Sequence, residues 1–447
     1  MKRLIRSDIL FLSMIFTLPF TGFPVFEIGF TVQISYIFAL LTLFSLIVEE
    51  IHKHSLKIIY APLMFPAFLF LFIIFLSIFQ SHFIPIGTKY MIHANTELFI
   101  HRPWIRSFVQ FFALLFMIIP FFLTVYFSKT KEMLYRIIYI WLIANLIASL
   151  YGLYGFVGHY LHFPFTKFAT FEGYDLFMIR RIKSVGLEPL LFGISITAIL
   201  PLGICLGFIK KKKWLFFLII PQLLALVLTF SRGTWLALII SLIIISFSLK
   251  DFLLKNIIKV FFSILFLFII LELLFHFLFH FSAVIYIRDR FLYIFSGKAD
   301  YSNLTRFDTW ITAWRMFKAH PILGVGIGNF WFHYYKYSPL LLGDWWIGKG
   351  AIPPTVNNLF LSFLAETGIL GVSALIVFWF ALFKMVIKSI FKTKDSEWQT
   401  ILIGNLACLL CLLIGYQFIS TFYFTYVWVL FGVSVAINNI LVRESTA

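Results

Sequence analysis

Arg232 lies in a short polar turn, residues 230–235, between two strongly apolar stretches that leave almost no loop. A positive charge at such a turn is unfavourable unless it meets a partner or a water-filled cavity. The position therefore favours an arginine that binds something. The alternative is a side chain that snorkels to a membrane interface.

A second charged cluster precedes another apolar stretch. Arg180, Arg181 and Lys183 are followed by Glu188 and Pro189. Three positive charges and a carboxylic acid at the start of a helix can hold an anion and place a carboxylate beside it. An ordinary capped helix with a basic rim is the alternative.

The segment 282–358 is rich in Trp, Tyr and Phe, so its composition is not that of a disordered linker. Between 302 and 320 apolar residues recur at three- and four-residue spacing, with Arg306, Asp308 and Arg315 elsewhere around the turn. This pattern predicts an amphipathic helix that lies on the membrane or folds back towards it.

Three glycines, Gly324, Gly326 and Gly328, follow that helix. A nucleotide-binding loop would need a preceding strand and a βαβ unit, neither of which this stretch offers. The glycines instead predict a flexible re-entrant turn beside a substrate.

Aromatic and polar residues complete the set of candidates. Asn357 and Asn358 close the segment, and Glu366 lies about two helical turns into the next apolar stretch. A carboxylate at that depth should face protein or water, where it can meet one of the arginines. The aromatic residues after the glycines suit both a sugar face and the membrane interface: Trp331, Tyr334, Tyr335, Tyr337, Trp345 and Trp346.

Membrane helices must position these residues, because the composition excludes a water-soluble globular chain. Of the 447 residues 62% are apolar and 12% are charged, and the mean hydropathy is +0.98. The apolar runs are long enough to cross a bilayer, which predicts an all-α integral membrane protein with a single polytopic domain over 1–447. The first run is expected to be a retained helix rather than a cleaved signal peptide. About twelve spans are expected, at roughly 8–24, 28–48, 58–79, 107–127, 134–157, 187–209, 214–231, 233–249, 257–281, 359–383, 398–416 and 420–441.

The basic residues set the expected orientation. Lys and Arg total 36 against 19 Asp and Glu, but the excess sorts by side of the membrane and so does not indicate nucleic-acid binding. One side holds 20 positive residues, of which only four are Arg, and we expect it to be cytoplasmic together with both termini. The other side holds 16, of which nine are Arg: Arg102, Arg106, Arg180, Arg181, Arg232, Arg288, Arg290, Arg306 and Arg315.

Arginine on the outer side is not explained by topology, because the orientation rule predicts its depletion there. Its planar fork suits phosphate and carboxylate groups, so we expect an anionic ligand at the outer face. The alternatives are contacts with outer-leaflet headgroups and ion pairs with Asp289, Asp300, Asp308 or Asp344.

The three cysteines give no sign of a disulfide framework. Cys205, Cys408 and Cys411 all lie in apolar stretches. The Cys408-x-x-Cys411 pair is therefore expected to pack in the core rather than to carry redox chemistry.

In order and spacing these pieces resemble the O-antigen ligase and O-antigen polymerase superfamily of bacterial inner-membrane glycosyltransferases. Each motif is short, and their order and common side of the membrane carry the resemblance. The motifs cover about 180–371 and comprise Glu188-Pro189 after the arginines, Ser-Arg-Gly-x-Trp at 231–235, Arg306-x-x-x-Trp310 running into His320-Pro321 and the glycines, Asn358-x-x-Leu361, and Glu366-Thr367-Gly368.

The resemblance implies a reaction and a fold. It implies glycosyl transfer on the periplasmic face from an undecaprenyl-diphosphate-linked oligosaccharide, by an enzyme that needs neither metal nor cofactor. The fold would be GT-C-like, with a large helical periplasmic loop at 282–358, between the ninth and tenth spans, that forms part of the active site. The expected partners are the lipid-linked donor, a second lipid-linked glycan or lipid A-core as acceptor, membrane lipids and a chain-length regulator.

The resemblance also implies site residues. Arg232 and Arg306 would bind the diphosphate and stabilise its growing charge as the anomeric carbon separates. Arg180 or Arg181 would supply a further contact to the same group. Asn358, Glu366 and Trp310 are expected to bind substrate.

One position departs from the family pattern. In the ligases a histidine expected to activate the acceptor hydroxyl precedes the Asn-x-x-Leu motif, and here that position is Asn357. Asparagine cannot serve as a general base at neutral pH. Either the base lies elsewhere, with Glu188 the first choice and Glu366 or Asp308 behind it, or Asn357 only orients the acceptor by hydrogen bonding. The missing histidine favours a polymerase, which joins lipid-linked repeat units, over a ligase that transfers glycan to lipid A-core in lipopolysaccharide biosynthesis.

Two other classes compete with an enzyme. A transporter or flippase of lipid-linked glycans would show charged residues near span centres and repeated halves, whereas these candidates crowd one face. A purely structural scaffold gives no reason for arginines on the disfavoured side. The sequence contains no ATP-binding motif, so the energy for synthesis would come from the activated lipid donor.

Overall fold

The computed structural model describes residues 6–22, 24–27, 31–53, 62–84, 102–171, 179–210, 213–248, 257–280, 282, 284–285, 288, 301–341 and 355–446. Asp289, Asp300, Asp344, Trp345 and Trp346, which the sequence singled out, lie outside the described residues, as do other parts of 282–358. The helices are α1 (Ser7–Phe16), α2 (Ile34–His52), α3 (Met64–Phe83), α5 (Pro103–Phe127), α6 (Lys131–Tyr160), α7 (Pro189–Thr197), α8 (Leu200–Lys210), α9 (Lys213–Leu228), α10 (Arg232–Ser248), α12 (Ile257–Phe279), α14 (Tyr301–Ala319), α15 (Phe330–Tyr337), α17 (Leu359–Lys392), α18 (Ser396–Gly415) and α19 (Thr425–Thr446). The strands form two short antiparallel pairs, β1 (Pro24–Glu27) with β2 (Thr31–Gln33) and β3 (Thr170–Phe171) with β4 (Arg181–Ile182).

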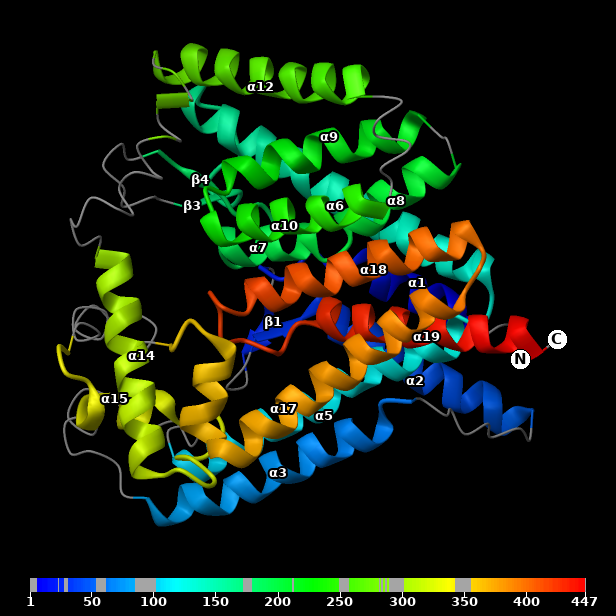
Figure 1. Ribbon diagram of the computed structural model, residues 1–447. Coiled ribbons are helices and arrows are strands. Elements are labelled where there is room, and N and C mark those ends of the chain that lie inside the picture. The colour runs from blue at the N-terminus through cyan, green and yellow to red at the C-terminus, as the bar shows by residue number, and fades with distance from the viewer. Residues whose placement is uncertain are drawn as a thin grey trace.

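The long helices run side by side and share two common ends (Figure 1). Both marked chain ends lie at the right of the view, beside the ends of α2 and α19. The helices α14 and α15, the β3–β4 pair and the start of α17 gather at the left. The arginine-bearing segments 180–181, 232 and 306 therefore share one end of the bundle.

Length and composition confirm an all-α integral membrane protein. Eight apolar helical segments are long enough to cross a membrane, and each falls on one of the expected spans. The four remaining expected spans coincide with the shorter apolar helices α1, α9, α10 and α12. Helix α3 lies at the edge of the bundle (Figure 1) and exposes Phe65, Phe68, Phe72 and Phe79, as expected of a lipid-facing surface.

The first two expected spans need correction. Helix α1 ends at Phe16, so the helix predicted over 8–24 is wrong beyond that residue. The chain then turns and forms β1 and β2, and α2 begins only at Ile34. Pro19, Gly22 and Pro24 explain the difference, because proline and glycine both disfavour the interior of a helix.

Helices α17, α18 and α19 share an aromatic core with the segment that joins α18 to α19. Trp379, Tyr416, Phe422 and Phe431 are almost fully buried and pack ring against ring. The three cysteines are free and buried, which confirms the prediction that they pack in the core.

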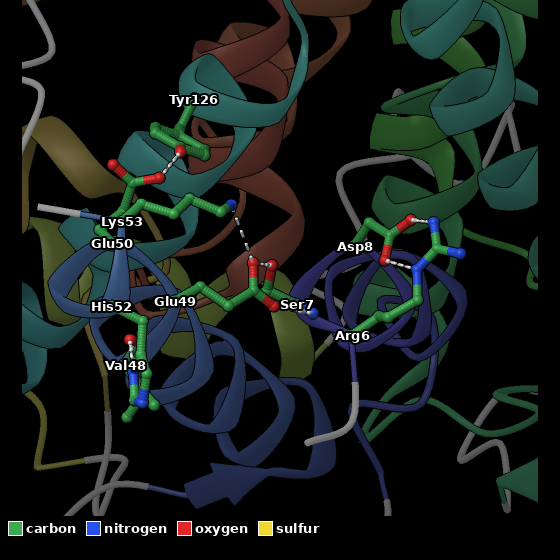
Figure 2. Close-up of polar contacts among 9 residues, drawn as sticks. All are labelled: Arg6, Ser7, Asp8, Val48, Glu49, Glu50, His52, Lys53 and Tyr126. Atoms are coloured by element: carbon green, nitrogen blue, oxygen red, sulfur yellow. Dashed lines mark hydrogen bonds and ion pairs between the residues drawn. The ribbon is translucent and has the colours of Figure 1, made fainter. Parts of the chain in front are cut away.

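Polar contacts join the helices at the end of the bundle opposite Arg181, Arg232 and Arg306. Figure 2 shows Glu49 of α2, which accepts hydrogen bonds from the backbone N–H of Ser7 at 3.0 Å and from the Ser7 hydroxyl at 2.9 Å. Lys53 pairs with the same carboxylate at 3.9 Å, and the Tyr126 hydroxyl of α5 donates to Glu50 at 2.9 Å. These contacts join α1, α2 and α5.

A second set of polar contacts at that end involves Glu397 of α18. Lys210 of α8 and Lys131 of α6 contact its carboxylate at 2.7 and 3.0 Å, and the Tyr135 hydroxyl donates to it as well. The expected cytoplasmic end is thus held by lysine–carboxylate contacts, whereas the opposite end carries the candidate site.

Candidate active site

The turn before Arg232 is fixed by local hydrogen bonds. The backbone N–H of Ser231 donates to the Thr229 hydroxyl at 3.2 Å, and the Trp235 indole N–H donates to the carbonyl of Leu226 at 3.1 Å. Phe230 is buried in a left-handed conformation with φ of 50°. Arg232 becomes the first residue of α10, where the positive end of the helix dipole and a guanidinium both favour an anion.

The β3–β4 pair brings Arg181 to this turn. The Arg181 Nε donates to the carbonyl of Thr229 at 2.9 Å. The preceding Arg180 turns the other way, and its guanidinium donates to the Thr170 hydroxyl at 3.3 Å. Of the two adjacent arginines, the geometry places Arg181 beside the Arg232 turn.

Glu188 lies directly before α7 and keeps an accessible surface. It interacts electrostatically with Arg181 and Arg306. The surrounding protein desolvates the carboxylate and raises its pKa, and the two positive charges oppose that rise without cancelling it. Glu188 is thus the carboxylate that the fold places among the arginines.

Arg306 reaches the cluster from α14. Its guanidinium carbon lies 5.9 Å from the ring centroid of Phe418, which follows α18. The same ring packs on Gly233, where an added Cβ would lie 2.5 Å from a ring carbon. Phe418 therefore bridges Arg306 and the backbone beside Arg232, a role that its sequence position gave no signal for.

Asp308 holds α14 to the segment that follows α15. Its buried carboxylate accepts hydrogen bonds from the hydroxyls of Tyr334 and Ser338, the latter at 2.8 Å, and from the backbone N–H of Leu340 at 3.2 Å. The ion pair with an outer arginine that the sequence left open for Asp308 does not form among the described residues. These contacts give Asp308 a structural role within the protein.

The two asparagines shape the start of α17. The Asn358 side chain caps the helix by accepting from the backbone N–H of Leu361 at 3.0 Å, and it donates to the Gln417 side chain at 3.2 Å. Asn357 has a left-handed backbone with φ of 53°, and its side-chain amide donates to the carbonyl of Thr355 at 3.2 Å. Asn358 thus ties α17 to the residue next to Phe418.

Trp310 lies on α14 and packs against the small apolar cluster that joins α14 and α15. Its ring contacts Phe307 with centroids 5.6 Å apart. The described contacts make Trp310 part of the support of Arg306, and its expected role in binding substrate stays a prediction.

The glycine run docks on a kink in α17. Gly368 has φ of 64° inside this helix, and the freed backbone groups pair with the run: Gly326 N–H donates to the carbonyl of Glu366 at 2.8 Å, and Val325 N–H to that of Ala365 at 3.0 Å. A Cβ at Gly324 would lie 2.3 Å from the backbone of Glu366. The glycines form the predicted turn, but backbone hydrogen bonds hold it in place rather than leaving it flexible. Its expected position beside a substrate stays a prediction.

Glu366 is buried beside this turn and accepts a hydrogen bond from the backbone N–H of Phe330 at 3.0 Å. The arginine that it meets is Arg106 of α5, with which it interacts electrostatically. Arg106 donates to the carbonyl of Gly328 at 2.7 Å, and its guanidinium carbon lies 4.6 Å from the ring centroid of Trp331. The excess of outer arginines was the only sequence signal for Arg106.

A pocket of about 250 Å³ opens between these groups. Its wall adjoins the arginine cluster, because it includes Leu187, next to Glu188, and Val356, next to Asn357. Among the residues that the structure describes, no three His, Cys, Asp or Glu side chains gather into a possible metal site. Metal independence itself stays a prediction.

The fold and the site define a multi-span membrane protein with arginines and a carboxylate gathered at one end of its helical bundle. Residues 214–376 match the family model described as O-antigen ligase. The match confirms the resemblance over that stretch, which contains Arg232, Arg306 and Glu366, and it supports a membrane glycosyltransferase of the O-antigen ligase or polymerase type that acts on lipid-linked glycans. No curated protein matches the chain.

Proposed function

We propose that this chain polymerises lipid-linked repeat units of an O-antigen or exopolysaccharide, with undecaprenyl-diphosphate-linked oligosaccharide as donor. The observation that carries the proposal is the convergence of Arg181, Arg306 and Glu188 at the turn that begins α10. The chain would lie in the inner membrane with both termini in the cytoplasm and this site facing the periplasm. The 282–358 segment would then form part of the site on the periplasmic side.

The arginines would act on the leaving group. The guanidinium groups of Arg232 and Arg306, helped by Arg181, bind the donor diphosphate. As the bond between the anomeric carbon and the phosphate oxygen breaks, negative charge grows on that oxygen. Preorganised donors stabilise this charge more in the transition state than in the ground state, which accelerates transfer.

Glu188 would act on the acceptor. An acceptor hydroxyl forms the new bond to the anomeric carbon, undecaprenyl diphosphate leaves with the electron pair, and the hydroxyl proton passes to the Glu188 carboxylate. Desolvation raises the pKa of Glu188 above its ordinary value, which makes the carboxylate a stronger base. Asn357 would at most orient the hydroxyl.

Ligation to lipid A-core is the second candidate function, because the matching family model is described as O-antigen ligase. The two reactions are separated by one assay on the purified, reconstituted protein. A lipid-diphosphate-linked repeat unit is supplied alone and, in parallel, together with lipid A-core, and the products are resolved by mass. A ladder from the donor alone supports the polymerase, and a single transfer that requires lipid A-core overturns it in favour of the ligase.

A further inference from the structure

The pocket beside Glu366 has the lining of a sugar site. Amide and hydroxyl groups of Gln33, Gln110, Ser362, Ser420 and Thr421 line it, together with aromatic rings. Hydroxyls of a sugar can pair with such groups while its C–H face packs on an aromatic ring. Arg106 and Glu366 are the two charged residues in the described lining, and both are already engaged within the protein: Arg106 donates to the carbonyl of Gly328, and Glu366 accepts from the backbone N–H of Phe330. The chemistry therefore fits a neutral sugar better than an anionic one.

The position of the pocket indicates that its ligand is the acceptor glycan rather than the donor diphosphate. Its wall contains Leu187 and Val356, the chain neighbours of Glu188 and Asn357, whereas Glu188 and Asn357 themselves and the arginines Arg181, Arg232 and Arg306 are not part of it. The pocket thus adjoins Glu188 through Leu187. A general base must lie within hydrogen-bond reach of the hydroxyl that it deprotonates. The sugar that carries this hydroxyl must therefore lie on the Glu188 side of the cluster, opposite the departing diphosphate.

We propose that this pocket binds the terminal, neutral sugar of the acceptor glycan, with Trp331 and Gln110 as contact residues. The proposal rests on the function proposed above and adds a subsite to it. Glu366 acts as a positioning residue, because its carboxylate holds the backbone N–H of Phe330, next to Trp331. Arg106 fixes the same turn through the carbonyl of Gly328.

The test measures glycan and donor binding separately. The probe is the free oligosaccharide released by mild acid from the lipid-linked repeat units of cells that carry this protein. Its affinity for the purified protein in nanodiscs is measured by calorimetry, and the affinity for the intact lipid-linked donor is measured in parallel. Trp331→Ala and Gln110→Leu are compared with Trp314→Ala, a matched control because Trp314 is exposed on α14 away from the pocket lining.

We expect Trp331→Ala and Gln110→Leu to weaken oligosaccharide binding at least about tenfold, the usual effect of losing one buried contact of about 1.4 kcal/mol. Trp331→Phe retains an aromatic ring and should retain most of the affinity, which guards against a folding defect in Trp331→Ala. The control Trp314→Ala should bind as the unchanged protein does. Equal oligosaccharide affinity in all variants would overturn the subsite, and so would a loss confined to the intact donor.

Glu366 gives an independent check on its positioning role. Glu366→Gln keeps an oxygen that can accept from Phe330 N–H, so it should keep oligosaccharide affinity and transfer, whereas Glu366→Leu should raise the acceptor KM with little change in kcat. Abolished transfer in Glu366→Gln would assign Glu366 to the reaction itself and overturn this role. Arg232→Ala separates the two proposals: it should bind the intact lipid-linked unit no more tightly than the free oligosaccharide, whose affinity should not change. Unchanged affinity for the intact unit would refute the diphosphate site alone.

Discussion

Phe418 packs against Arg306 and against Gly233, the chain neighbour of Arg232, so it links two arginine-bearing helices that are far apart in the sequence. In the orientation proposed above, each arginine stands on the side of the membrane where the positive-inside rule disfavours a positive charge. The planar guanidinium can bind two phosphate oxygens at once, which the ammonium of lysine cannot do with the same geometry. The identity of the residue, beyond its charge, should therefore matter.

Replacing either arginine by lysine tests this point. We expect Arg232→Lys and Arg306→Lys to keep the positive charge but lose about 100-fold in kcat, the effect of removing one preorganised donor. Arg315→Lys is the matched control, because Arg315 lies exposed on the same helix as Arg306. Transfer by the reconstituted protein is measured for all three, and full activity in both site variants would rule out the diphosphate clamp.

The ionisation of Glu188 gives a second prediction at this scale. Its pKa is raised by desolvation and lowered by Arg181 and Arg306, so removal of either positive charge must raise it further. A base must be deprotonated to act, and the transfer rate should therefore rise with pH through the pKa of Glu188. In Arg181→Gln the remaining activity should show this rise at higher pH, and in Glu188→Gln the rise should be missing. A pH profile that is the same in all three proteins would exclude Glu188 as the base.

At the scale of elements, Asn358 at the start of α17 makes two contacts with different consequences. Asn358 caps the helix and bonds Gln417. Loss of a side-chain cap costs about 1 kcal/mol of folding stability. Its described contacts are within the protein, so its effect on substrate would act through the position of Phe418.

Substitutions of Asn358 separate its effect on stability from its effect on activity. Asn358→Ala should lower the thermal unfolding temperature and the activity together, whereas Asn358→Asp keeps the cap oxygen but loses the donor to Gln417. We expect Asn358→Asp to recover most of the stability and only part of the activity, measured by thermal unfolding in detergent and by the transfer assay. Full activity in Asn358→Ala would show that the cap has no influence on the site.

A second feature at the scale of elements is the contact between the glycine run and the kink in α17. Gly368 has φ of 64°, and a Cβ there would lie 2.3 Å from the carbonyl oxygen of Ile322. Gly368→Ala should destabilise the protein by roughly 1–3 kcal/mol, the cost of a strained backbone conformation, and should displace Glu366. Gly415→Ala is the control, since an added Cβ would meet only side-chain atoms of Ile194 at 3.1 Å. Thermal unfolding that is equal in the two variants would contradict this account.

At the scale of the whole molecule, the two ends of the bundle differ in chemistry. Lysine–carboxylate contacts hold the end that carries both chain termini, and the arginine site lies at the opposite end. The positive-inside rule assigns the lysine-rich end to the cytoplasm. The orientation follows from this rule and is open to direct measurement.

Cysteine labelling in intact cells tests the orientation. The native cysteines are buried, so a new cysteine at an exposed position should dominate labelling by a membrane-impermeant maleimide. If the proposed orientation holds, Lys318→Cys on α14 should react before the membrane is permeabilised, and Lys394→Cys, between α17 and α18, only afterwards. The reverse order would place the arginine site in the cytoplasm and contradict the proposed reaction there.

Hydropathy by itself determined the class of protein and nearly all of the helices, because a bilayer requires long apolar helices whatever their arrangement. It failed at 17–33, where Pro19, Gly22 and Pro24 end the helix and a strand pair replaces it. Residue chemistry likewise singled out Arg232, Arg306, Glu188 and Glu366, since charges are rare and costly in such a chain.

Only the tertiary structure decided which of these residues meet. Arg181, the first residue of β4, donates to Thr229 in the Arg232 turn, whereas Arg180, which precedes the strand, donates to Thr170. Phe418 and Arg106 could be assigned to the site only from contacts between segments that are distant in sequence. Periodicity shows which residues share a face of one helix, but packing between helices sets which faces come together, and that depends on the fit of all the side chains at once.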